Sequence, residues 1–185
     1  LGMQGCLCPS LLARCNDAIT NIPKGTMAAD RQRILLGQYH TLRAMTYFEL
    51  VKVYGGVPLV LEPQEPDNIK VNGRASAKEC FKVIVNDLDS AMVMLDGVTW
   101  DDGTGRGKLT KAAAAALKAK ALLYWASPQF NPTNDPKHPY QASRWQDALI
   151  ANKEGIKKTA SPKYLNCTAR IFFKILTLFI LVEKR

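Results

Sequence analysis

The chain has 185 residues and a formal net charge of +9, with 47% hydrophobic and 22% charged residues, which is the composition of an ordinary globular domain. Residues 153–185 hold 8 basic and 2 acidic side chains, whereas residues 1–152 hold 17 and 14 and are nearly balanced. A nucleic-acid-binding protein carries its basic side chains as a patch on the folded body. We therefore expect no nucleic-acid partner.

The five cysteines are scattered along the chain: Cys6, Cys8, Cys15, Cys80 and Cys167. No second pair follows Cys6 and Cys8 at ligand spacing, which argues against a zinc site. Cys15 and Cys80 fall on apolar helix faces and are predicted to be buried free thiols. The five residues before Cys6 are too few for the charged and apolar regions of a signal peptide, and the chain begins with Leu1. We expect the natural start to be missing.

The first two predicted helices are separated by a turn after Pro23. Ser10 is positioned to cap the first helix, which ends at that proline. Asp30 is positioned to cap the second, which runs to about Tyr54 and stops at Gly55-Gly56. One seam of the second helix carries small and apolar residues, namely Gly37, Thr41, Ala44, Phe48 and Val51. Small side chains let a neighbouring helix approach closely, so we expect this helix to be buried between neighbours.

Three further helices have clear start signals. Ser76 and Glu79 form a capping box that is followed by apolar residues at helical spacing. Thr110 is positioned to cap the alanine-rich segment "KAAAAALKAKALLYWA". Ser143 and Gln146 form a second capping box. The predicted buried face of the last helix contains Trp145, Ala148, Leu149 and Ile156.

The connections between these helices are unusually long. The segment "VPLVLEP" (57–63) is predicted as a short apolar strand, and residues 55–75, 96–109 and 127–142 are rich in Gly, Pro, Asn and Asp. Long connections are uncommon in helical bundles and tend to carry function. The helix starts at 76, 110 and 143 lie 34 and 33 residues apart, close to the tetratricopeptide period. The sequence therefore predicts a mainly α, tetratricopeptide-like scaffold with long loops.

No motif predicts catalysis. His40 lies inside a helix and His138 in a Pro-rich loop, and neither has a neighbour that suggests a nucleophile or a metal site. "GTGRGKLT" (103–110) fails as a phosphate loop, because Leu109 follows Lys108 where Ser or Thr is required. "WDDGTG" lacks the alternating ligands of a calcium loop. We expect no enzymatic activity, no catalytic residue, no cofactor and no metal.

Five segments together resemble one protein family. "RQRILLGQYHTLRAMTYFELVKVYGGVPLVLEP" is similar to the signature of the RagB/SusD family of outer-membrane nutrient-binding lipoproteins. "LLARCNDAITNIP" resembles the helix before it, and "GRASAKECFKVIVNDLDSAMVML" the helix after it. "GRGKLTKAAAAALKAKALLYWASPQFNP" and "RWQDALIANKEGIKKTASPKYL" follow in the family's order. The resemblance spans residues 11–165 and identifies the chain as a SusD-like N-terminal region.

The resemblance also predicts the domain organisation. Residues 11–165 correspond to an incomplete SusD-like helical domain, while residues 1–10 and 166–185 do not match the family pattern. The apolar run from Ile171 to Val182 is too short to span a bilayer. We expect a truncated or frame-shifted piece of a longer protein, with a short protein carrying an amphipathic tail as the alternative.

The family implies a cell-surface protein that captures oligosaccharides or other nutrients without catalysis. It would sit at the outer membrane as a lid on a TonB-dependent SusC-like β-barrel transporter, held by a lipid anchor absent from this chain. The resemblance further implies that "VPLVLEP" leads into a loop packed beside the preceding helix, so that the signature is mainly architectural. An intracellular helical-repeat scaffold for protein interaction and a non-functional fragment remain alternatives.

Sugar binding needs aromatic faces for C–H surfaces and planar polar side chains for hydroxyl groups. The loops offer five candidate ligand-binding residues: Trp100, Asp101, Asn131, Asn134 and Tyr140. No family motif fixes any of them, and packing within the loops is their alternative role. Trp125 and Trp145 lie on helix faces and are predicted to belong to the core. An enzyme acting on glycans would instead need a pair of carboxylates in a cleft.

Overall fold

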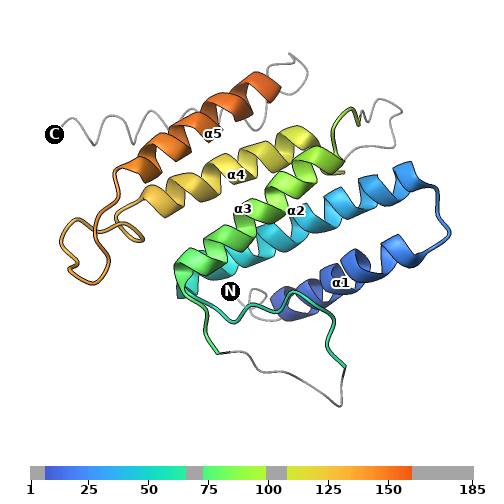
Figure 1. Cartoon of the computed structure of the whole chain (residues 1–185), viewed down its shortest axis with the longest axis horizontal. Helices are drawn as coiled ribbons and strands as arrows, with labels where there is room; N and C mark the ends of the chain where they lie inside the picture. Colours follow the sequence, from blue (N-terminus) through green and yellow to red (C-terminus); the bar gives the residue numbers. More distant parts are fainter. Residues whose placement is uncertain (1–6, 66–72, 99–107, 160–185) are drawn as a thin grey trace.

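The computed structural model describes residues 7–65, 73–98 and 108–159. These residues form five α-helices, each antiparallel to its neighbour in the chain (Figure 1), and a single 3-10 turn: α1 (Leu7–Asn21), η1 (Ile22–Lys24), α2 (Ala29–Tyr54), α3 (Ala77–Met94), α4 (Lys111–Ala126) and α5 (Ser143–Thr159). Each α-helix packs mainly against the helix before and the helix after it. The predicted mainly α scaffold with long loops is confirmed.

Two of the predicted helix caps are present as hydrogen bonds. Ser76 Oγ accepts the backbone N–H of Glu79 at 3.2 Å, and the Ser76 N–H donates to Glu79 Oε2 at 2.8 Å, which completes the capping box. Thr110 Oγ1 accepts the N–H of Ala113 at 3.1 Å. Each cap satisfies a backbone donor that the first helical turn leaves free, and contributes about 1 kcal/mol. These caps fix where α3 and α4 begin.

Other predicted boundaries are wrong. Helix α1 begins at Leu7, so Ser10 lies inside it, and α5 begins at Ser143 itself. Helix α2 begins at Ala29, and its N-cap Ala28 makes no side-chain cap. Asp30 instead lies in the first turn, where its negative charge interacts favourably with the helix dipole. In each case the predicted polar residue lies within the helix, not at the N-cap position before it.

The predicted strand at residues 57–63 is also wrong, since none of the described residues lies in a strand. The backbone groups of this segment bind helix side chains instead of a neighbouring strand. Tyr47 Oη donates to the carbonyl of Val60 and accepts its N–H, both at 2.8 Å. Asn16 Nδ2 also donates to the Val60 carbonyl at 2.8 Å. The segment therefore packs beside α1 and α2, as the family resemblance implied.

The core lies between α2, α3 and α4. All five residues of the predicted seam of α2 are buried, and so are Phe81, Ile84 and Leu88 of α3. Phe48 contacts Phe81 and Tyr124 edge to face, with ring centroids 6.4 Å and 5.3 Å apart. Gly37 lets α3 approach, because a Cβ there would come within 2.7 Å of Leu95 Cγ. Small residues and aromatic rings together determine how closely these helices pack.

Helix α5 differs from its predicted face. Ala148, Ala151 and Asn152 are buried against α4, whereas Leu149 is 48% exposed. The helix packs against α4 through small side chains and Gly155, which lies near the backbone of Ala115. Trp145 is half-buried. The sequence predicts one apolar stripe along α5. Close packing on the alanine-rich α4 instead favours its small residues.

A double glycine ends α2. Gly55 has φ +72°, a left-handed conformation that favours glycine, and its N–H donates to the Val51 carbonyl at 2.9 Å. Gly56 lies against the backbone of Ala75, where a Cβ would overlap the Ala75 carbonyl oxygen. Arg74 Nε donates to the Gly56 carbonyl at 2.5 Å, and its Nη2 donates to the carbonyl of Tyr54. The turn thus joins the end of α2 to the residues that precede α3.

A buried polar network connects α1, α2, α3 and the 57–61 segment. Arg43 donates to both carboxylate oxygens of Asp87, at 2.8 Å and 2.7 Å. Its Nη1 also donates to Asn16 Oδ1 at 3.0 Å and to the carbonyl of Leu61 at 3.2 Å. His40 Nδ1 lies 2.8 Å from Asp87 Oδ1. Burial alone raises the pKa of Asp87, but hydrogen bonds from Arg43 and His40 outweigh it and hold that pKa below its ordinary value.

Two cysteines also belong to this interior. Cys15 and Cys80 are buried and free, as predicted. Burial raises the pKa of both thiols. A buried, protonated thiol behaves as a small apolar side chain, so both residues fill space in the core.

Candidate functional site

The best-defined candidate is the loop of residues 127–142 between α4 and α5. It begins with a tight turn in which the N–H and Oγ of Ser127 both donate to the Tyr124 carbonyl. The N–H groups of Phe130 and Asn131 then donate to the carbonyl of Ser127 at 3.0 Å and 2.8 Å. These bonds continue from the end of α4 and give the loop a defined exit direction.

Asn131 closes the base of this loop. Its side-chain Nδ2 donates to the Gln141 carbonyl at 3.0 Å, and its Oδ1 accepts the Gln141 N–H at 2.8 Å. The side chain therefore pairs with a backbone amide in the way that a neighbouring strand would. Asn131 is only 2% exposed. Residues 132–140 form the tip of the loop beyond this closure, and we call them the loop tip.

Arg144, in the first turn of α5, fills the space behind the closure. Its Nη1 donates to the Phe130 carbonyl at 2.8 Å and to the Trp125 carbonyl at 3.4 Å, and its Nε donates to Gln141 Oε1 at 3.0 Å. The guanidinium lies over the Trp125 ring, 3.7 Å from its centroid. Partial burial lowers the pKa of Arg144 from its ordinary value. A planar donor on an aromatic face is well suited to join several carbonyls at once.

The base of the loop is also continuous with the protein core. Phe130 packs edge to face on Phe81, with centroids 5.0 Å apart, and Trp125 lies equally close to Phe81. Gln129 Nε2 donates to the Lys52 carbonyl of α2 at 3.3 Å. Trp125 therefore packs against the core, as predicted. These contacts place the loop at the end of the bundle where α2 ends and α5 begins.

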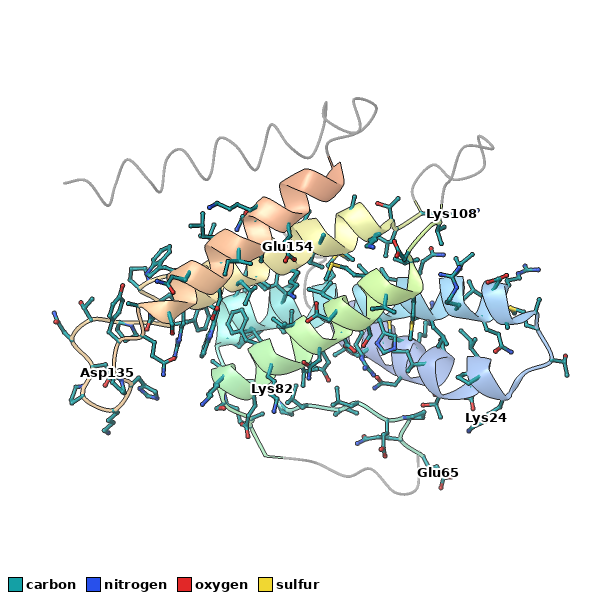
Figure 2. All side chains as sticks on the ribbon, turned by 45° about the horizontal axis from the view of Figure 1, so that its top comes forward. Lys24, Glu65, Lys82, Lys108, Asp135 and Glu154 are labelled. Atoms are coloured by element: carbon teal, nitrogen blue, oxygen red, sulfur yellow. The ribbon has the colours of Figure 1, made fainter. Side chains whose placement is uncertain are left out.

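The loop tip presents polar and aromatic side chains to solvent. Asp135 projects at the far end of the loop (Figure 2), where its Oδ1 accepts the Lys137 N–H at 2.8 Å and its Oδ2 lies 2.8 Å from His138 Nδ1. The hydrogen bond from His138 and then that from the Lys137 backbone lower the pKa of Asp135. The tip thus has its own internal bonds in addition to the closure at its base.

The structure describes three of the five predicted ligand-binding residues and gives them different environments. Asn134 and Tyr140 are exposed on the loop tip, whereas Asn131 is buried at its base. Trp100 and Asp101 lie outside the described residues. Lys108, which precedes α4, lies at the opposite end of that helix from Asp135 (Figure 2). The 16 residues of α4 span about 24 Å at 1.5 Å per residue.

Sequence reasoning missed Arg144. The stretch "SRWQ" was interpreted only as a capping box, although an arginine in a first helical turn is disfavoured by the helix dipole. That conflict was the available signal, because a cation in this place needs another partner. The partners are carbonyls and a ring contributed by residues 125–141. No pattern in the sequence shows this return of the loop onto its own start.

Within the described segments, no cluster of three or more His, Cys, Asp and Glu side chains could hold a metal ion. No helix in the same segments has the length and apolar character needed to cross a bilayer. The described residues form a scaffold of consecutive antiparallel helices with long loops at its ends.

Comparison with known proteins identifies the family to which this chain belongs. A family model described as SusD-like, "starch-binding associating with outer membrane", matches residues 11–123. The chain therefore belongs to the SusD-like family. Proteins of this family bind carbohydrate and associate with the outer membrane.

Individual relatives agree with this assignment. Two SusD-like proteins from Formosa agariphila are 30% identical over 105 residues and 34% identical over 118 residues. A SusD-like protein of known structure from Bacteroides fragilis superposes with a TM-score of 0.65 at 32% identity over 79% of this chain. A structure described as a laminarin-binding SusD-like protein gives a TM-score of 0.56 at 30% identity over 64% of the chain.

The matches cover only part of each relative. The chain spans 18% and 22% of the two Formosa proteins and 25% of each of the two solved structures. What is compared is thus one region of a larger architecture.

Proposed function

We propose that this chain is part of a cell-surface protein that binds an oligosaccharide and delivers it to a TonB-dependent, SusC-like outer-membrane β-barrel transporter, without catalysis. Membership of the SusD-like family is the observation that carries the proposal. The whole protein would be a surface-exposed lipoprotein of the outer membrane. Its ligand class is an oligosaccharide or another nutrient recognised by stacking and hydrogen bonding.

The chemistry of the loop tip supports ligand binding. Tyr140 is 42% exposed, and its ring can stack on the C–H surface of a sugar. Asn134 offers an amide that both donates to and accepts from hydroxyl groups. Trp100 and Asp101, which lie outside the described residues, are further proposed ligand contacts.

Laminarin is the first probe, because a related protein is described as binding it. We expect the 185-residue chain to be retarded in affinity electrophoresis with laminarin and to give a saturable heat signal in calorimetry. The variants Asn134→Ala and Tyr140→Ala should each weaken binding about 5-fold to 30-fold, since one lost polar or stacking contact is worth about 1–2 kcal/mol. The control is Arg31→Ala, which changes an exposed residue of α2 outside the 127–142 loop.

A panel of other glycans widens this test. Absence of binding to every glycan would contradict the proposal, whereas release of new reducing ends would contradict the absence of catalysis. The transporter is tested separately. Co-expression of the full-length protein with a candidate SusC-like β-barrel protein should allow both to be purified together from the outer membrane.

A further inference from the structure

The base of the 127–142 loop is built differently from its tip. The tip side chains Asn134 and Tyr140 face solvent, whereas the base holds a buried amide and a guanidinium that bind only parts of the protein itself. A side chain whose hydrogen-bonding groups are already occupied and buried has little left to offer a ligand. Base and tip therefore have different roles.

Asn131 closes the loop with a bond in each direction. The Gln141 N–H and carbonyl are both used by one side chain, so residues 131 and 141 stay paired while the tip projects beyond them. A loop without such a closure loses conformational entropy when a ligand orders it, and the affinity falls accordingly. With the closure, this conformational entropy is lost on folding and not on ligand binding.

Arg144 joins the closure to the helices. Its guanidinium binds the Phe130 carbonyl next to Asn131 on one side of the closure and the Gln141 side chain on the other. The same group lies on the Trp125 ring, which packs against Phe81 of α3. Arg144 thus adds a planar link between the loop and the bundle, beside the Phe130–Phe81 and Gln129–Lys52 contacts.

We propose that Asn131 and Arg144 are positioning residues that hold the loop tip in a binding-ready conformation, with Asn134 and Tyr140 as the residues that touch the ligand. This inference rests on the proposed glycan-binding function. It changes the role of Asn131 from a ligand contact to a support, and it adds Arg144, which binds no ligand itself.

Hydrogen exchange in the absence of ligand tests the closure directly. In Asn131→Ala the Gln141 amide loses its acceptor, so we expect its exchange to accelerate about 10-fold or more. Asn131→Asp is the comparison variant, because it keeps an acceptor for the Gln141 N–H while its second carboxylate oxygen repels the Gln141 carbonyl and its charge is buried. Its Gln141 amide should exchange more slowly than that of Asn131→Ala. Equal exchange in the wild type and Asn131→Ala would overturn the closure.

Arg144→Lys and Arg144→Ala test whether Arg144 holds the closure against the helices. Lysine keeps the charge but not the planar fork, so both variants should accelerate exchange at Gln141 and change the tryptophan fluorescence of the chain. Arg31→Ala should change neither. Added ethylguanidinium at millimolar concentration should restore protection in Arg144→Ala but not in Arg144→Lys, whose side chain occupies the site. Unchanged exchange in both variants would overturn the role of Arg144.

Binding to the tightest glycan of the panel then separates positioning from contact. We expect Arg144→Ala to weaken binding about 10-fold with a less favourable binding entropy, and ethylguanidinium to recover it. Tyr140→Ala should weaken binding without changing exchange at Gln141. Full affinity in a variant whose loop exchanges fast would overturn the positioning role. If the wild type binds no glycan, the proposed function and the ligand-presenting role both fail, whereas the exchange results still decide the closure.

Discussion

Arg43 and Asp87 form a two-pronged ion pair that joins α2 to α3 inside the protein, with both residues less than 10% exposed. Arg43 lies in the segment that resembles the family signature and Asp87 in the segment that follows it, and both are buried. The geometry makes them structural rather than ligand-binding, because every oxygen of the carboxylate is occupied by protein donors. Their contribution can be measured.

Asp87→Ala should destabilise the chain by about 3–5 kcal/mol, because it leaves the Arg43 guanidinium buried without its counter-ion. The comparison is Asp89→Ala, which breaks a pair with Lys118 in which the Asp89 side chain is 46% exposed. That change should cost about 0–1 kcal/mol. Urea denaturation measures both. Equal losses in the two variants would show that the buried pair has no special weight.

The same carboxyl group predicts how stability depends on pH. The pKa of Asp87 is lower in the folded state than its ordinary value of about 3.9, so below that value the unfolded state binds more protons. The stabilisation is present in full above about pH 5 and is lost as the pH falls through the folded-state pKa. Thermal unfolding between pH 3 and pH 7 should therefore show a steeper acid loss in the wild type than in Asp87→Asn.

The close packing of Gly56 on the backbone of Ala75 can be tested by adding a methyl group. Gly56→Ala should cost about 1–3 kcal/mol or more, because the new Cβ overlaps the backbone carbonyl of Ala75 and backbone atoms cannot rotate away. Gly73→Ala should stay within about 0.5 kcal/mol, since nothing lies within 4 Å of its Cβ position. Chemical denaturation of the two variants checks the contrast. A neutral Gly56→Ala would show that residues 55–57 do not pack on Ala75.

Tyr47 provides a test of the segment that was predicted as a strand. Tyr47→Phe removes one hydroxyl that serves both the N–H and the carbonyl of Val60, so we expect a loss of about 1–3 kcal/mol and faster exchange of the Val60 amide. Tyr54→Phe is the control, because Tyr54 is 61% exposed. A protected Val60 amide in Tyr47→Phe would mean that another group holds the segment.

Local signals predicted the parts of the fold that depend on local chemistry. The capping box at Ser76 and the stop at Gly55-Gly56 were found because each needs only neighbouring residues. The strand at 57–63 was mispredicted because its apolar pattern is satisfied by α1 and α2, whose side chains supply the hydrogen bonds. Contacts between residues 13 to 44 positions apart leave no periodic trace in the sequence.

The candidate site was predictable only in part. Composition pointed to the 127–142 loop, because aromatic and amide residues in a long connection indicate ligand contacts. It could not separate Asn131 from Asn134, since both are asparagines in the same loop and their roles differ through burial alone. Arg144 was missed for a related reason. Two of its hydrogen-bond acceptors are backbone carbonyls, which every sequence contains.

The polar network around Arg43 has a consequence for cooperativity. Its members come from α1, α2, α3 and the 57–61 segment, so no pair of these elements alone satisfies the guanidinium. An intermediate that contains only two of them would bury a donor without an acceptor, and its population would be small. The first three helices should accordingly melt and reform together as one unit. A substitution at Asn16 would then loosen α3, to which Asn16 is linked through Arg43.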